Sequence, residues 1–208
     1  MEELGKKEVK AEDIAKNVIE DPDLLPELFK GISSENSRIR FKAAKTLRII
    51  SERNQKMLYS KMDFFINLLD SKNRILKWTA IDVIGNLASV DSENKFDKIF
   101  KEYYGFLSAA SMITVGHVID NSGKVAKAKP HLTEKITSEL LKIEKIPTKP
   151  PLTQECKNIL LGKAISAFGT YFNQIDNKDD VISFVKRQLN NTRNATKVKA
   201  EKFLKMRS

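Results

Sequence analysis

A twelve-residue segment of this chain occurs twice, 37 residues apart, and this repetition constrains the fold more than any other feature. Residues 36–47 align with residues 73–84 and match in type at most positions, and a shorter copy lies at 196–204. The copies share a basic residue, an Ala three positions later and an aliphatic residue four beyond, at Arg40/Ala43/Leu47, Lys77/Ala80/Ile84 and Lys197/Ala200/Leu204. This spacing places both apolar residues on one stripe of a helix. Repetition at such a period predicts stacked helical units that bury their apolar faces against neighbours.

The rest of the chain shows helical periodicity without any sustained alternation typical of strands. We therefore predict an all-α, right-handed α-solenoid of about five antiparallel helical hairpins in a single domain, residues 1–208. A capping helix within 1–21 precedes hairpins at 24–53, 56–89, 95–128, 131–173 and 178–206. Lys56 to Leu69 is expected to form one continuous helix, and the second helix of the third hairpin is expected to begin near Ala110. The register of that helix stays open because it contains Gly116 and Gly123.

The repeated segments resemble the HEAT/armadillo-type solenoid repeats. That family usually has an Asp in the turn six residues before the basic residue; here the turn positions are Ser34, Ser71 and Asn191, while the basic position is matched by Arg40, Lys77 and Lys197. The resemblance implies that the second helices line a concave face. It also implies that the shared basic residues are structural and bind carbonyl groups of the turns.

Charge is unevenly distributed along the chain, whose formal net charge is +10. Acids outnumber bases in residues 1–30, whereas bases dominate residues 178–208. The second helices carry additional basic residues, which we predict to form a partner-binding surface on the concave face: Arg38, Lys42, Lys45, Arg48, Lys163, Lys199 and Lys202. Such a surface would attract an acidic peptide or a phosphate backbone. An ordinary solvated lysine-rich surface is the alternative.

These features predict a non-enzymatic protein-interaction scaffold that binds an acidic partner through this face and the proline-rich loop Pro147 to Pro151. We expect this loop to be extended and stiff. The first alternative is DNA or RNA binding through the phosphate backbone. Such binding would be non-specific, because no base-reading signature accompanies the lysines. A distant third is an enzyme resembling the HEAT-like alkylpurine DNA glycosylases. Only Asp82 and Trp78 offer the carboxylate and aromatic group that such an enzyme needs around a flipped base.

We expect neither a metal nor a cofactor. His117, His131 and Cys156 are too widely separated for a zinc site, although His117 and Asp120 share a helical face. The Gly116 to Lys124 segment lacks the glycine spacing of a phosphate-binding loop, so its glycines are interpreted as positions of close helix packing or of a kink. The N-terminus lacks an apolar signal core and the apolar runs are short, which predicts a cytoplasmic protein without membrane spans. Oligomeric state and the identity of the partner stay open.

Overall fold

Helices account for nearly all of the secondary structure in the computed structural model, which describes residues 2–109 and 111–207 without the Glu2 side chain. Residues 1 and 208 of the predicted domain, and the expected helix start at Ala110, lie outside the described residues. Within the described ranges the chain forms helices and connecting turns and has no strand. It divides into two compact units, Met1–Phe96 and Asp97–Ser208. The prediction that all 208 residues form one domain stays a prediction.

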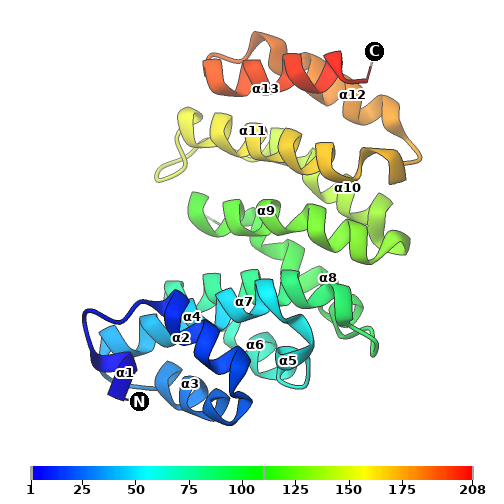
Figure 1. Cartoon of the computed structure of the whole chain (residues 1–208). Helices are drawn as coiled ribbons and strands as arrows, with labels where there is room; N and C mark the ends of the chain where they lie inside the picture. The colour runs from blue at the N-terminus through cyan, green and yellow to red at the C-terminus, as the bar shows by residue number, and fades with distance from the viewer. Residues whose placement is uncertain (1, 110, 208) are drawn as a thin grey trace. The chain divides into compact units, whose positions relative to one another are not determined.

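Unit 1 contains two helical hairpins preceded by short N-terminal helices (Figure 1). Its elements are α1 (Glu2–Gly5), α2 (Ala11–Glu20), η1 (Pro22–Leu24), α3 (Leu25–Ile32), α4 (Ser37–Arg53), α5 (Gln55–Tyr59), α6 (Met62–Leu68), α7 (Arg74–Leu87) and η2 (Ala88–Val90). Helix α4 packs against both α2 and α7, while α3 packs on α4 and α6 on α7. We call α2, α4 and α7 the second-helix layer of unit 1.

The two full copies of the repeated segment form the same local structure. Each second helix is capped by an Asn side chain, with Asn36 accepting from the backbone N–H of Arg38 and Asn73 from that of Ile75, both at 3.0 Å. Along each helix the shared Ala and aliphatic positions are completely buried, as the repeat predicted. The sequence repetition is therefore a structural repetition of cap and packing stripe.

The turn positions where the family has Asp also act alike. Ser34 and Ser71 each accept a hydrogen bond from the backbone N–H two residues later at 3.2 Å, and Asn191 does so at 2.9 Å. In the first copy, Arg40 Nη1 donates to the Ser34 carbonyl at 2.8 Å. This contact confirms the predicted turn-capping role for Arg40. The same prediction is wrong for Lys197, which is exposed and binds no turn carbonyl among the described residues. Short polar residues thus preserve the local turn although the family's aspartate is missing.

The first helix of the second hairpin differs from the sequence prediction. Instead of one helix from Lys56 to Leu69, the chain forms α5 and α6, separated at Ser60 and Lys61. The Tyr59 hydroxyl donates to Asp91 Oδ1 at 3.0 Å and accepts from the Glu93 backbone N–H at 2.9 Å. The end of α5 is therefore fixed to the loop after α7. A tertiary contact of this kind overrides local helical propensity.

Unit 2 contains three hairpins with first helices α8, α10 and α12 and second helices α9, α11 and α13 (Figure 1). Its elements are α8 (Lys95–Gly105, whose first two residues belong to unit 1), η3 (Phe106–Ser108), α9 (Met112–Ala128), η4 (Pro130–Leu132), α10 (Thr133–Leu141), η5 (Lys142–Lys145), α11 (Gln154–Tyr171), η6 (Phe172–Gln174), α12 (Lys178–Arg187), η7 (Gln188–Asn190) and α13 (Asn194–Lys205). Helix α11 packs against both α9 and α13, and these three form the second-helix layer of unit 2.

Glycines allow the close approach of helices in this layer. A Cβ added at Gly123 of α9 would lie 2.2 Å from Thr170 Oγ1 of α11, and one at Gly162 would lie 2.8 Å from Thr196 Oγ1 of α13. These distances are shorter than van der Waals contact, so a larger residue would push the helices apart. The interpretation of Gly123 as a packing position is confirmed.

The proline-rich loop between α10 and α11 is held at both ends. The Ile146 N–H donates to the Ile143 carbonyl at 3.2 Å, and the Leu152 N–H donates to the Lys149 carbonyl at 2.7 Å. Leu152 is buried, whereas Pro147 and the residues through Pro151 are exposed. The loop is therefore turned near its end instead of extended throughout, because burial of Leu152 draws the chain back toward α11.

Candidate interaction surface on the second helices

Two of the predicted binding residues in unit 1 form ion pairs between adjacent second helices. Lys45 Nζ of α4 lies 2.8 Å from Glu12 Oε1 of α2. Arg48 Nη1, one turn further along α4, lies 3.4 Å from Asp82 Oδ2 of α7. Asp82 is only 7% exposed, so its carboxylate is held in a largely desolvated position beside the guanidinium. The charges of Lys45 and Arg48 are thus compensated inside the fold.

The other two predicted residues of α4 keep their charge uncompensated. The Lys42 ammonium donates to the backbone carbonyl of Lys6, which orients the side chain without neutralising it. Arg38 is exposed, and its side chain makes no hydrogen bond or ion pair with any described residue. Lys42 also lines a shallow hollow of about 830 Å³, where Lys7, Lys10 and Lys45 are joined by the acids Glu12 and Asp13. Cations outnumber acids in this hollow, so its net charge is positive.

Unit 2 shows the same division among the predicted residues. Lys163 of α11 forms an ion pair with Asp120 of α9. Lys199 of α13 donates to the Gly162 carbonyl of α11 at 3.3 Å, and that contact leaves its charge uncompensated. Lys202 is exposed and its side chain has no partner among the described residues. Only Lys163 of this group is neutralised by a carboxylate.

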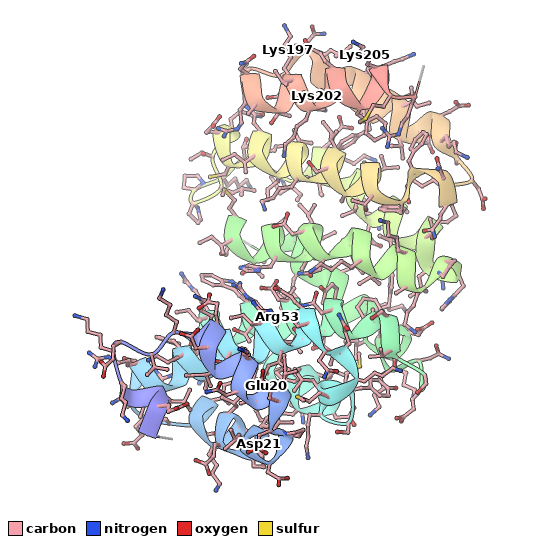
Figure 2. The ribbon with its side chains drawn as sticks, viewed as in Figure 1. Glu20, Asp21, Arg53, Lys197, Lys202 and Lys205 are labelled. Carbon is pink, nitrogen blue, oxygen red and sulfur yellow. The ribbon has the colours of Figure 1, made fainter. Side chains whose placement is uncertain are left out.

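Helix α13 carries the clearest uncompensated positive charge. Thr196, Ala200 and Phe203 bury one face of the helix, while Lys197, Lys199 and Lys202 project from the rest. We call these three residues the α13 lysines; Lys197 and Lys202 are labelled on this helix in Figure 2. Among the described residues no carboxylate lies within ion-pair distance of any of the three. Their charge is therefore available to an external anion.

The carboxylates that compensate the other cations were missed by the sequence analysis. They lie about one repeat away in the chain: Arg48 and Asp82 are 34 residues apart, and Asp120 and Lys163 are 43 apart. The sequence does contain a signal for these pairs: an acid on one second helix and a base on the next, about one repeat apart. This pattern distinguishes cations that have a carboxylate partner from those that have none.

The residues that the sequence offered for catalysis or for metal binding are engaged in packing and ion pairs. Asp82 is buried beside Arg48, and Trp78 is half-buried on the same helix. Asp120 is bound to Lys163, and the Gly116 to Lys124 segment lies within α9. Within 2–109 and 111–207, no group of three His, Cys, Asp or Glu side chains is arranged to hold a metal ion. The described helices include none with the length and apolarity required to span a bilayer.

Two solved structures are similar to this chain over most of its length. One is a designed armadillo repeat protein, with a TM-score of 0.58 and 15% identity, covering 98% of this chain and 87% of that one. The other is an engineered protein from a structural genomics consortium, with a TM-score of 0.57 and 15% identity, covering 94% and 87%. No protein-family profile matches the sequence, and neither does any curated protein.

At 15% identity these similarities show the fold alone. The chain has an all-α repeat fold of the HEAT/armadillo type, as the repeated segments predicted. A fold of this kind does not by itself assign a function, so any function must be argued from the side chains that it presents.

Proposed function

We propose that this protein is a non-enzymatic interaction scaffold that binds an acidic segment of a protein partner through uncompensated cations of its second helices. The observation that carries the proposal is the set of α13 lysines, three ammonium groups on one packed helix that have no carboxylate partner in the described part of the chain. Such groups accelerate association and form ion pairs at the rim of an interface. The predicted cytoplasmic location stays a prediction.

The proposal divides the seven predicted residues into two groups. Arg38, Lys42, Lys199 and Lys202 contact the partner, because their charges are not neutralised within the fold. Lys45, Arg48 and Lys163 instead hold neighbouring second helices together through carboxylates. An acidic partner would have to displace an existing carboxylate to reach them, and the ion pair gained would replace the one lost.

The test uses a fluorescein-labelled peptide of 20 residues built from Glu and Ser, with binding followed by anisotropy. Neutralising the α13 lysines together (Lys197→Gln, Lys199→Gln, Lys202→Gln) is expected to weaken binding about tenfold, since each rim ion pair contributes about 0.5 kcal/mol. The matched control neutralises three exposed lysines of unit 1 that lie outside the second helices: Lys56→Gln, Lys61→Gln and Lys72→Gln. Its net charge changes equally, so it is expected to lose less than about twofold through screened, long-range attraction.

A labelled 20-base-pair duplex is measured in parallel at two salt concentrations. Stronger binding to the duplex than to the peptide, with a steep loss at higher salt, would support non-specific nucleic-acid binding and overturn the proposal. Equal losses in the two triple variants would also overturn it, because the effect would then follow net charge and not the α13 surface.

A further inference from the structure

A cleft on the first helices of unit 2 is lined by none of the second-helix cations described above. It has a volume of about 500 Å³ and runs between α8 and the α10–η5 segment, with the start of the proline-rich loop at one edge. Clefts that hold ligands usually enclose about 300–1,000 Å³. The space is therefore large enough to receive apolar side chains from another chain.

The floor of the cleft is apolar and uncharged. Tyr104, Leu107 and Ile143 are buried beneath it, and the Phe100 ring packs against the Tyr104 ring with centroids 4.7 Å apart. The Tyr104 hydroxyl donates to Ser122 Oγ at 3.2 Å, so it is directed to α9 and already satisfied. Burial raises the pKa of Tyr104 and keeps the phenol neutral. The floor thus favours an apolar group and offers a charged or polar group little compensation.

The rim of the cleft is positively charged. Lys101 and Lys145 are exposed and have no ion-pair or hydrogen-bond partner for their ammonium groups among the described residues. The third rim lysine, Lys142, lies 2.7 Å from Glu139, the acid that lines the cleft. Nearby Glu144 is neutralised by Arg187, whose Nη2 lies 2.6 Å away. Two uncompensated cations therefore flank an apolar floor.

The edge formed by the proline-rich loop is fixed before any partner binds. Ile146 and Pro147 line the cleft, and the Ile146 N–H is bonded to the Ile143 carbonyl at 3.2 Å. Proline has a restricted backbone, so little further ordering is needed on binding. A partner can thus use a preformed wall.

We propose that this cleft binds a peptide segment of another protein that presents a bulky apolar side chain flanked by carboxylates. The apolar anchor occupies the floor over Tyr104 and Ile143, and the carboxylates pair with Lys101 and Lys145. This arrangement, an apolar anchor in a pocket with charged groups at the rim, is a common form of peptide recognition. The proposal rests on the proposed function in one respect, that the partner is an acidic protein segment, and it adds a second contact surface.

Gly105 is a position at which a side chain can be added to test the cleft. It lines the cleft at the last residue of α8, and its φ of −57° and ψ of −28° are right-handed helical values that any residue adopts. An added Cβ would meet no heavy atom within 4 Å. Gly105→Trp therefore adds a bulky ring at the wall of the cleft without a clash at its Cβ, and Gly105→Ala is the matched control that adds a single methyl group.

The probes are two labelled 16-residue peptides rich in Glu, one with Leu at two positions four apart and the other with Ser at both. Wild type and Gly105→Ala are expected to bind the Leu peptide at least about tenfold more tightly than the Ser peptide, the difference expected for anchoring by a large apolar side chain. In Gly105→Trp the ratio falls to about one. Lys101→Gln with Lys145→Gln weakens the Leu peptide several-fold and lowers its salt dependence.

Failure of this inference is distinguishable from failure of the proposed function. Neutralising the α13 lysines should weaken the Ser peptide about tenfold and the Leu peptide less, because the Leu peptide is also held in the cleft. Loss of the α13 effect would therefore overturn the proposed function without touching the preference for Leu over Ser. A ratio near one in the wild type, or a ratio that Gly105→Trp leaves intact while circular dichroism shows a native fold, would overturn the cleft assignment. If Gly105→Trp lowers helicity, Gly105→Leu and the double lysine variant decide the question by the same ratio. Self-association through the cleft, detected by sedimentation of the wild type, would replace the proposed occupant by a second copy and also overturn it.

Discussion

Helices α4 and α13 carry the same repeated motif, with six basic residues in α4 and four in α13, yet the two helices differ in how many of these charges are neutralised by a neighbour. Helix α4 lies between two second helices, and its Lys45 and Arg48 find carboxylates on α2 and α7. Helix α13 packs against one second helix, α11, and its Lys199 reaches only a backbone carbonyl there. The comparison teaches that a basic residue in a stacked repeat is available for binding only where the neighbouring helix supplies no acid.

If this comparison holds, a cation paired with a carboxylate should stabilise the fold. The most buried lysine with such a partner among the described ion pairs lies in unit 2. Lys129 Nζ is 2.7 Å from Asp97 Oδ2, with only 4% of the lysine side chain exposed, and His131 also contacts this carboxylate. We expect Asp97→Asn to lower the free energy of unfolding by about 3 kcal/mol at pH 7, because Lys129 loses its carboxylate partner. Urea denaturation followed by circular dichroism measures this loss.

The same pair predicts a pH dependence. Burial alone would raise the pKa of Asp97, but hydrogen bonds from Lys129 and His131 outweigh it and hold the pKa below its ordinary value. A carboxyl with a lowered pKa contributes stability that is complete above the unfolded value of about 3.9 and is lost as the pH falls through the folded value. The difference between wild type and Asp97→Asn should therefore shrink below about pH 4. A constant difference from pH 7 to pH 3 would contradict the assignment.

A smaller effect is expected from Arg48→Glu in α4, which places a second carboxylate beside buried Asp82. We expect a loss of about 2 kcal/mol, below the value for a fully buried pair because Arg48 is 39% exposed. Lys202→Glu in α13 makes the same charge change and should alter stability by less than about 0.5 kcal/mol. Fluorescence of Trp78, the single tryptophan, follows unfolding of unit 1, and circular dichroism follows both units.

Similar losses of stability in these two variants would remove the distinction between α4 and α13. Circular dichroism is needed for Lys202→Glu because Trp78 does not belong to unit 2.

The smallest predicted effect concerns the exposed pair between Lys45 and Glu12. A hydrogen bond from Lys45 is the main cause that lowers the pKa of Glu12. In Lys45→Gln this pKa should rise toward the ordinary glutamate value, as measured by NMR titration of the side-chain carboxyl. An unchanged Glu12 pKa would show that Lys45 is not paired in solution and could contact a partner after all.

The sequence predicted the helical hairpins because their determinants are local or periodic. The caps at Asn36 and Asn73 and the buried stripe of Ala43 and Leu47 can be read directly from residue type and spacing. The interruption between α5 and α6 could not, because it depends on Tyr59 reaching a loop more than 30 residues later. The proline-rich loop was expected to be extended, and burial of Leu152 was not anticipated.

The candidate site was predictable in composition but not in its electrostatics. Counting basic residues on second helices points to α4 and α13, yet it treats Arg48 and Lys202 alike. Their difference comes from Asp82, a residue of the next repeat that tertiary packing brings to 3.4 Å. The cleft over Tyr104 and Ile143 was missed for a similar reason, since its walls come from two hairpins.

The central claim is that Lys199 and Lys202 of α13 offer free charge, whereas carboxylates already neutralise Lys45 and Arg48 of α4. It is tested most directly by two double neutralisations of equal charge. One is Lys199→Gln with Lys202→Gln, and the other is Lys45→Gln with Arg48→Gln. For the Glu and Ser peptide, the first should raise the Kd about fivefold and the second less than about twofold. Equal increases in Kd, or a larger increase for the α4 pair, would contradict the account.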